Sequence, residues 1–160
     1  MDPFAETADA FVSMAHTIVW CTVATVDRSG RPRTRILHPI WEATDDGLVG
    51  WIATRPTALK RAHIAAHPHV SCSYWAPSHD TCLAECDASW ANDDETRARV
   101  WDLFRHGPEP VGYDPTIVPG WTGPLVDAFG VLRLVPWRLR VFPGTLLLGQ
   151  GGTLRSWARD

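Results

Sequence analysis

One stretch of the chain combines residue types that bind phosphate groups. It runs from Thr54 to Lys60 and reads Thr-Arg-Pro-Thr-Ala-Leu-Lys. Free N–H groups at the start of a helix attract anions, Arg55 can bind two phosphate oxygens at once, and Lys60 adds a positive charge one turn into the helix. The stretch therefore predicts a phosphate site, although it lacks the glycines of a P-loop. The alternative is that Thr54 only caps the helix while both cations are solvated.

Two further cations lie on the preceding apolar strand. Arg33 and Arg35 are two residues apart, so their side chains point to the same face of that strand. Beside a phosphate site they would bind the polar edge of a ligand. On an ordinary strand they would be exposed surface residues, and the pattern alone leaves both interpretations open.

Short strands and helices position these residues. Apolar and β-branched runs bounded by turn signals predict strands, and helical spacing of apolar residues predicts helices. Residues 107–124, with five prolines, read as an irregular loop with one short helical turn. The strands are expected at 19–26, 32–41, 48–54, 69–75, 81–90, 129–135 and 137–142, with a bend or edge at Pro136, and the helices at 6–16, 56–66 and 93–105.

Tight turns between consecutive strands make neighbours antiparallel. The order therefore predicts a mainly β protein with peripheral helices, in which about six antiparallel strands form a small barrel. The length of 160 residues suits one domain over 1–160, and we find neither an internal repeat nor a second domain.

Composition and charge exclude several functions. A formal charge of −3 gives no basic field to capture nucleic acid, and no window is long and apolar enough to span a bilayer. The first residues lack a signal-peptide pattern, so a cytoplasmic protein is expected. Its four cysteines match no zinc spacing and are expected to be reduced and buried. Nine tryptophans suggest a dimer interface or a planar ligand as well as a core.

Taken together, the two cationic stretches resemble the pyridoxamine 5'-phosphate oxidase-like FMN-binding split barrels. That family has an Arg followed by three ring-contacting residues on its second strand, which here is the run 35–38. Its third strand ends in an aromatic or small residue plus Thr, with Lys six residues later, which matches Ala53, Thr54 and Lys60. An Asn-Pro or similar dipeptide then precedes the next strand, where this chain has His67-Pro68. The similarity is good over 19–90 and looser beyond.

The resemblance implies a six-stranded antiparallel split β-barrel of Greek-key type with flanking helices, and a homodimer with FMN at its interface. Thr54, Arg55 and Lys60 would hold the phosphate, while Arg35 and the next three residues would meet the isoalloxazine ring. Trp51 would lie near the ring or ribityl chain, and Trp75, Trp137 and Arg138 are candidates for completing the site from the partner subunit. The expected cofactor-binding residues are Arg35, Ile36, Leu37, His38, Trp51, Ala53, Thr54, Arg55, Lys60, Trp75 and Trp137.

The sequence departs from the true oxidases of that family. Ile40 stands where they carry a substrate-binding Lys, and the tail over 153–159 lacks their His. Their Gln is also absent from the strand before the long helix. Pyridoxamine phosphate is therefore not the expected substrate. We expect a flavin-dependent oxidoreductase acting on an unidentified small molecule, with no assignable catalytic side chain and no metal.

Two alternatives stay open: a non-catalytic module that binds FMN, a deazaflavin or haem, and a structural dimer without a cofactor. His63, His67 and His69 form a local cluster that is expected on the surface. His38, which follows the ring-contacting strand, is the histidine expected nearest the flavin, and His38, His63 and His67 would be the candidate haem ligands.

Overall fold

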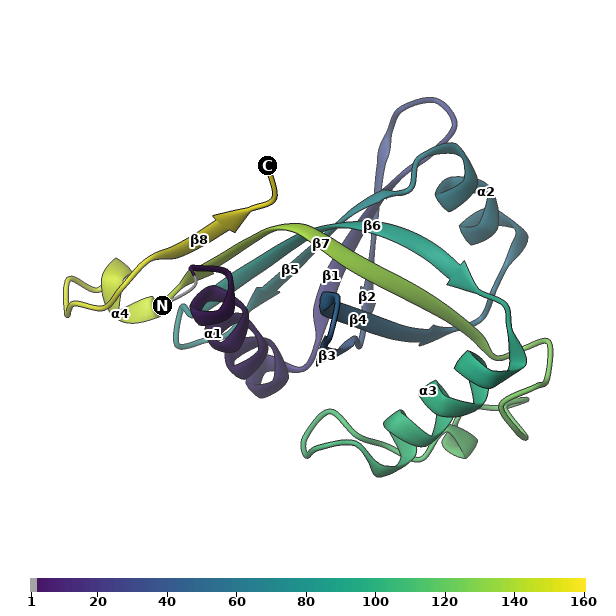
Figure 1. The fold of residues 1–160 in the computed structure, drawn as a ribbon. Helices are drawn as coiled ribbons and strands as arrows, with labels where there is room; N and C mark the ends of the chain where they lie inside the picture. Colours follow the sequence, from purple (N-terminus) through teal and green to yellow (C-terminus); the bar gives the residue numbers. More distant parts are fainter. Residues whose placement is uncertain (1–2) are drawn as a thin grey trace.

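The structure is a computed structural model that describes residues 3–160. Its helices lie around one antiparallel sheet (Figure 1). They are α1 (Pro3–Ile18), α2 (Ala58–Ala66), α3 (Asp94–His106), the single 3-10 turn η1 (Pro115–Ile117) and α4 (Gly144–Leu147).

The described chain contains eight strands, all paired in antiparallel fashion. They are β1 (Cys21–Val26), β2 (Pro32–Leu37), β3 (Ile40–Thr44), β4 (Gly47–Thr54), β5 (His69–Trp75), β6 (Thr81–Ala91), β7 (Gly130–Phe142) and β8 (Arg155–Ala158). Their order across the sheet is β2-β1-β5-β6-β7-β4-β3, and β8 pairs with one end of β7. The protein is therefore mainly β with peripheral helices, as the sequence predicts.

The strand count differs from the expected six because three short segments were misread. The run 32–41 divides into β2 and β3 around His38-Pro39, since the chain leaves one strand there and starts another. The tail 155–158, for which the sequence analysis predicts no strand, forms β8 against β7. Conversely, Pro136 does not interrupt β7: the register shifts between Glu85 and Cys86 on the neighbouring strand, and this bulge accommodates the missing N–H.

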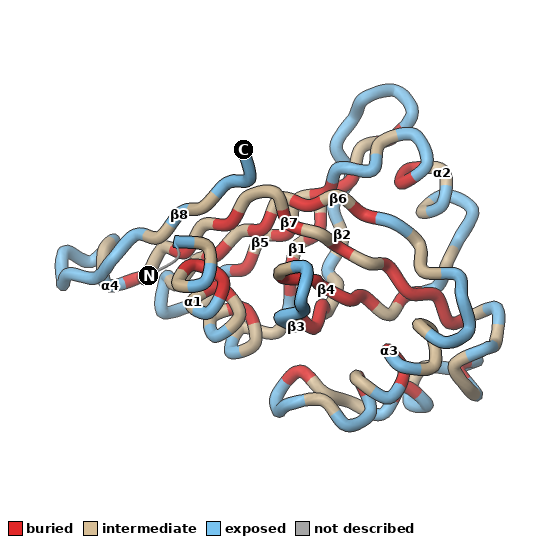
Figure 2. The backbone as a smooth tube through the Cα atoms, viewed as in Figure 1, coloured by how far each residue is buried: buried red, intermediate tan, exposed pale blue. Residues whose placement is uncertain are grey.

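Two apolar clusters lie against the sheet, and Figure 2 shows that much of the sheet backbone belongs to buried residues. Helix α1 covers one through Phe11, whose ring meets Trp41 edge to face at 4.9 Å. Helix α3 covers the other through Trp101, which packs against Phe129 at 5.0 Å. Both helices are amphipathic, so each buries an apolar stripe against strands.

The four cysteines are buried and unpaired, as expected. His63 corrects the sequence analysis, which expected it on the surface: its residue exposure is only 2%. Among the described residues, no helix is long and apolar enough to cross a membrane, and no cluster of metal-binding side chains occurs.

Candidate functional site

Much of the predicted site gathers around one cavity of about 470 Å³. The end of β2 supplies Ile36 and Leu37, and His38 follows that strand directly. The end of β4 and the turn into α2 supply a second group. The lining residues are Trp20, Ile36, Leu37, His38, Ala53, Thr54, Arg55, Thr57, Lys60, Tyr113, Ile117, Val118 and Trp121. The two stretches that the sequence analysis singled out therefore meet across one pocket.

The ends of β2 and β4 meet although these strands are separated in the sheet. Strands β1, β5, β6 and β7 lie between them in the hydrogen-bonded order. The sheet curls (Figure 1), and sheet twist makes such curling favourable. The pocket consequently depends on the curvature of the whole sheet.

The polar end of the pocket is organised around Lys60. Its Nζ donates to Thr54 Oγ1 at 2.6 Å and to the Arg55 carbonyl at 3.2 Å. The Arg55 guanidinium donates to the Pro119 carbonyl, which ties the turn to the loop after α3. Lys60 and Arg55 therefore converge at the point where β4 ends.

The positive charges of Arg35, Arg55 and Lys60 repel one another. Burial, followed by the charges of Arg35 and Arg55, lowers the pKa of Lys60. Burial, followed by the charge of Arg33, lowers the pKa of Arg35. Within the described residues, none of Arg35, Arg55 and Lys60 forms an ion pair with a carboxylate. An anion placed among them would relieve this repulsion.

The helix start differs in detail from the expected one. Thr57, not Thr54, is the N-cap of α2, and its hydroxyl accepts from the Lys60 backbone N–H at 3.3 Å. The helix therefore begins at Ala58, two residues after the expected Pro56. The Thr54 hydroxyl is consequently available to the Lys60 ammonium, and the interpretation that Thr54 only caps the helix is wrong.

His38 lies where the apolar wall meets the loop after α3. Its Nε2 is 2.6 Å from the Val111 carbonyl; a carbonyl only accepts, so Nε2 carries the proton and Nδ1 is an acceptor. Burial lowers the pKa of His38, an effect opposed by that hydrogen bond. The ring also contacts Trp20 and Tyr113, both with centroids 5.1 Å away. His38 is therefore a neutral, oriented imidazole at pH 7.

The opposite wall comes from residues that the sequence analysis did not select. Tyr113, Ile117, Val118 and Trp121 all belong to the proline-rich loop over 107–124. Trp121 is fixed by its own hydrogen bond from Nε1 to the Ala128 carbonyl at 2.8 Å. This loop has no periodicity, and only the excess of tryptophan hinted at a planar ligand.

Four predicted site residues do not line this pocket. Arg35 lies behind it, beside a small internal cavity that Lys60 also lines. Trp51 is buried under α3: its Nε1 donates to Glu42 at 2.7 Å and the Arg99 guanidinium lies 4.9 Å from its ring centroid, so its surroundings are structural.

Trp75 and Trp137 are the other two. Trp75 is 60% exposed and meets the ring of His79, whereas Trp137 lies within β7 and its backbone carbonyl accepts from the Arg159 N–H at 2.8 Å. Neither of these two tryptophan side chains lines the pocket of its own chain.

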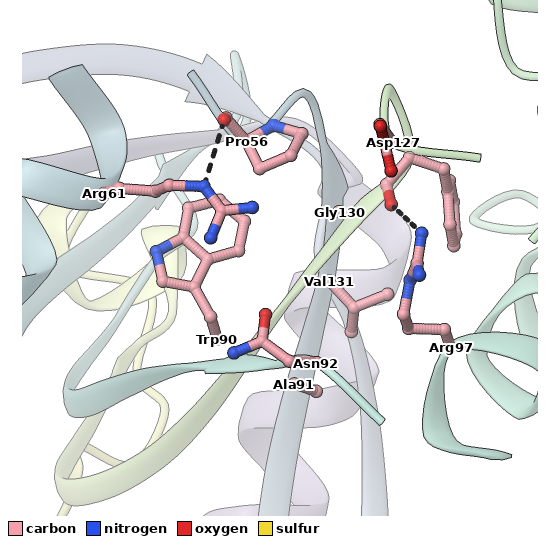
Figure 3. Close-up of a pocket in the computed structure, with 10 residues that line it drawn as sticks. Pro56, Arg61, Trp90, Ala91, Asn92, Arg97, Asp127, Gly130 and Val131 are labelled. Atoms are coloured by element: carbon pink, nitrogen blue, oxygen red, sulfur yellow. Dashed lines mark hydrogen bonds between the residues drawn. The ribbon is translucent and has the colours of Figure 1, made fainter. Parts of the chain in front are cut away.

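A second cavity, of about 330 Å³, lies between α2, the end of β6 and the start of β7 (Figure 3). Two arginines line it, but both have structural partners. Arg97 donates to the carbonyls of Val126 and Phe129 at 2.7 and 3.0 Å, and Arg61 stacks over Trp90 at 5.5 Å. This cavity therefore offers fewer available cations than the first.

Compared by sequence, the chain matches no protein-family model and no curated protein. Compared by structure, it matches a protein related to general stress protein 26 of Bacillus subtilis, of the pyridoxine phosphate oxidase family, from Clostridium acetobutylicum. The TM-score is 0.70 and the identity 9%, over 99% of this chain and 96% of that one. A pyridoxamine 5'-phosphate oxidase-related FMN-binding protein from Nostoc punctiforme matches with a TM-score of 0.64 and 17% identity, over 98% and 89% of the chains.

An F420 reductase also matches, with a TM-score of 0.57 and 17% identity, over 81% of this chain and 94% of that one. The fold and the site therefore define a β-rich split-barrel protein. More particularly, the chain has the fold of the pyridoxamine 5'-phosphate oxidase-like proteins, as the sequence resemblance predicts.

Proposed function

We propose that the protein binds FMN and acts as a flavin-dependent oxidoreductase on a small organic substrate. One observation carries the proposal: two cations without carboxylate partners, Arg55 and Lys60, lie at one end of an apolar pocket, and the charge of a third, Arg35, reaches Lys60 from behind it. FMN has a phosphate at one end and a flat, mostly apolar tricycle at the other. The volume of about 470 Å³ lies within the range of cofactor sites.

The residues present fit this cofactor in charge and in surface type. Thr54, Arg55 and Lys60 would hold the phosphate. The segment 36–38 would contact the tricycle, with Trp20 and Tyr113 as aromatic neighbours. The lowered pKa of Lys60 supports this assignment, because a phosphate dianion would offset the repulsion among the cations.

The flavin would supply the hydride or electron transfer, while the protein would supply orientation and exclusion of water. His38 holds a proton at Nε2 against the Val111 carbonyl, which leaves Nδ1 able to accept one. Ile117 is 71% exposed and lies on the pocket rim, where it would shield a bound ring from water. Oxidation of pyridoxamine phosphate is not proposed, because Ile40 is a buried core residue and offers no cation to a second phosphate.

The alternative cofactor is a deazaflavin such as F420, which offers a phosphate and a similar tricycle. The likeness to an F420 reductase favours testing it in parallel. Haem is a second alternative. His63 is buried and bonded to Thr25, whereas His38 uses only Nε2 for its bond to Val111, which leaves Nδ1 for a metal.

We also propose that the active form is a homodimer in which the partner completes the flavin site. Trp20 and Ile36 line the pocket and are each 60% exposed, and large apolar side chains at a pocket mouth favour a covered surface. Trp75 is a further exposed tryptophan for such an interface. The strands β2-β1-β5-β6-β7-β4 would correspond to the six-stranded barrel of that family, extended by β3 and β8. Four unpaired thiols support a reducing, cytoplasmic location.

The test is a set of titrations on the purified protein. Absorbance and tryptophan fluorescence are recorded with FMN, F420, riboflavin and haemin, and the mass in solution is measured with and without ligand. Micromolar or tighter binding of FMN, with weaker binding of riboflavin, is the expected result. Tight binding of F420 alone would show that the cofactor is a deazaflavin and not FMN. A Soret band with haemin alone would show that the protein binds haem and not a flavin. Binding of none of these ligands would refute the proposal.

A further inference from the structure

Behind the pocket, three polar side chains form a chain of hydrogen bonds inside the protein. Thr25 lies on β1, Arg35 on β2 and His63 on α2. The Arg35 Nη1 donates to Thr25 Oγ1 at 2.8 Å, and Thr25 Oγ1 lies 3.2 Å from His63 Nδ1. Thr25 and His63 are 6% and 2% exposed, so water does not compete strongly for these bonds.

This chain of hydrogen bonds forms with either tautomer of His63. A guanidinium can only donate, so Thr25 Oγ1 accepts from Arg35, and its single O–H is then free to donate to His63 Nδ1. The second lone pair of Oγ1 can equally accept from Nδ1, so the bond forms in either tautomer of His63, and the other ring nitrogen is Nε2. That Nε2 is buried and has no hydrogen-bond partner among the described residues. A buried polar atom without a partner is unfavourable whether it is a donor or an acceptor, so the position of His63 is maintained against a free-energy penalty.

This chain of hydrogen bonds links β2, which carries Arg35, to α2, which carries Lys60. His63 lies three residues after Lys60 on α2, about one turn further along the helix. Arg35 and Lys60 line the same small cavity, of about 20 Å³, and the charge of Arg35 lowers the pKa of Lys60. Edge strand β2 pairs in the sheet only with β1. Arg35 is partly exposed, and its bond to Thr25 limits the positions that its long side chain can adopt.

We propose that Thr25 and His63 are positioning residues, which hold the Arg35 guanidinium beside Lys60 so that the anion site is preorganised. The inference rests on the proposed function, because it assigns these residues to the same cofactor site. Arg35 lines only the small cavity behind the pocket, so it acts on the anion through its charge and through its neighbour Lys60. Preorganisation of this kind raises affinity because the ordering cost is met before binding.

The experiment compares FMN dissociation constants, measured by tryptophan quenching, for matched variants. Thr25→Val removes the hydroxyl at nearly constant volume and should weaken binding about tenfold, the order expected for a hydrogen bond to a charged group. Thr25→Ser keeps the hydroxyl and should bind FMN like the wild type. His63→Asn keeps an acceptor near Nδ1 and should do the same, whereas His63→Leu should behave like Thr25→Val. Thr7→Val, at an equally buried threonine on α1, controls for general loss of stability.

A double-mutant cycle separates positioning from structure. If Thr25 acts through Arg35, Thr25→Val should add less than about a twofold effect in an Arg35→Ala background. Equal loss in both backgrounds, or wild-type affinity for Thr25→Val, would overturn the inference while leaving FMN binding intact. If Thr25→Val does not fold, Thr25→Ser and His63→Asn provide the test. A tenfold loss of FMN affinity in either variant contradicts the assignment of Thr25 and His63 as positioning residues. A wild-type protein that binds neither FMN nor F420 would instead refute the proposed function.

Discussion

Replacing Lys60 tests the proposed anion site most directly, because Lys60 is the only lysine in the chain. Its ammonium donates to Thr54 and to the Arg55 carbonyl, and its pKa is lowered by burial and by two neighbouring guanidinium groups. Lys60→Met keeps the aliphatic stem and removes the charge. In the free protein this loses two hydrogen bonds but relieves repulsion, so we expect stability to change by less than about 1 kcal/mol.

With the phosphate bound, the same charge also attracts the phosphate, while the repulsion from Arg35 and Arg55 is present in both states and cancels from the change in affinity. Two unit charges 4 Å apart interact by about 1 kcal/mol in water and about 4 kcal/mol at an effective dielectric constant of 20. Lys60 is half-buried, which places the pair between these limits, at about 2 kcal/mol. Lys60→Met should therefore weaken FMN binding about 30-fold.

The assay measures the dissociation constants of FMN and riboflavin in parallel, because riboflavin carries the same ring without the phosphate. Riboflavin binding should change less than about twofold, since the lost interaction is local to the phosphate. Arg61→Met is the matched control: it removes the next cation of α2, whose guanidinium stacks on Trp90. Equal losses for FMN and riboflavin, or an equal effect of Arg61→Met, would refute the assignment of Lys60 to the phosphate.

Three further outcomes are expected. Because the lowered pKa of Lys60 leaves more of the neutral amine near pH 9, an acylating reagent should modify Lys60 faster than a model peptide, and FMN should protect it in peptide mass maps. Trp51→Phe should reduce the free energy of unfolding by about 1 kcal/mol through its lost hydrogen bond without changing FMN affinity. Trp20→Ala should instead weaken FMN binding and leave the free energy of unfolding unchanged. Equal effects of the two variants on FMN affinity would show that Trp51 belongs to the binding site. Burial lowers the pKa of both His16 and His38, so the unfolded chain binds protons first as the pH falls, and stability should decline below about pH 6.5. His16→Gln keeps an acceptor for the Trp41 N–H and should flatten that decline in thermal unfolding between pH 7.5 and 5; an unchanged profile would contradict the cause.

The part of the site that could be predicted from sequence is the part encoded locally. Thr54, Arg55 and Lys60 come together because a strand end, a turn and one helical turn place them within seven residues. Trp51 does not line the pocket, for a different reason. Period two correctly puts it on the same face as Ala53, but α3 covers Trp51 and leaves Ala53 at the pocket, and the helix position is not encoded in the strand.

Contacts distant in sequence account for the remaining differences. His63 looked like a surface residue on a short alanine-rich helix, because its partner Thr25 is 38 residues away on another element. The wall formed by Tyr113 and Trp121 comes from a loop whose prolines carry no periodicity. Its placement is set by the Arg55 bond to Pro119 and the Trp121 bond to Ala128, and such bonds become visible only once the chain is folded.

The negative net charge of the whole chain contrasts with a local excess of positive charge around the pocket. Residues 28–61 hold seven cationic and three acidic residues, a local formal charge of +4, so the other residues together carry −7. At physiological salt, charges are screened beyond about 8 Å, so an anion inside the pocket responds to Arg35, Arg55 and Lys60 and hardly to the acidic remainder. A chain that repels anions at long range can therefore hold one tightly, and its selectivity then depends on how rigidly those three cations are held together.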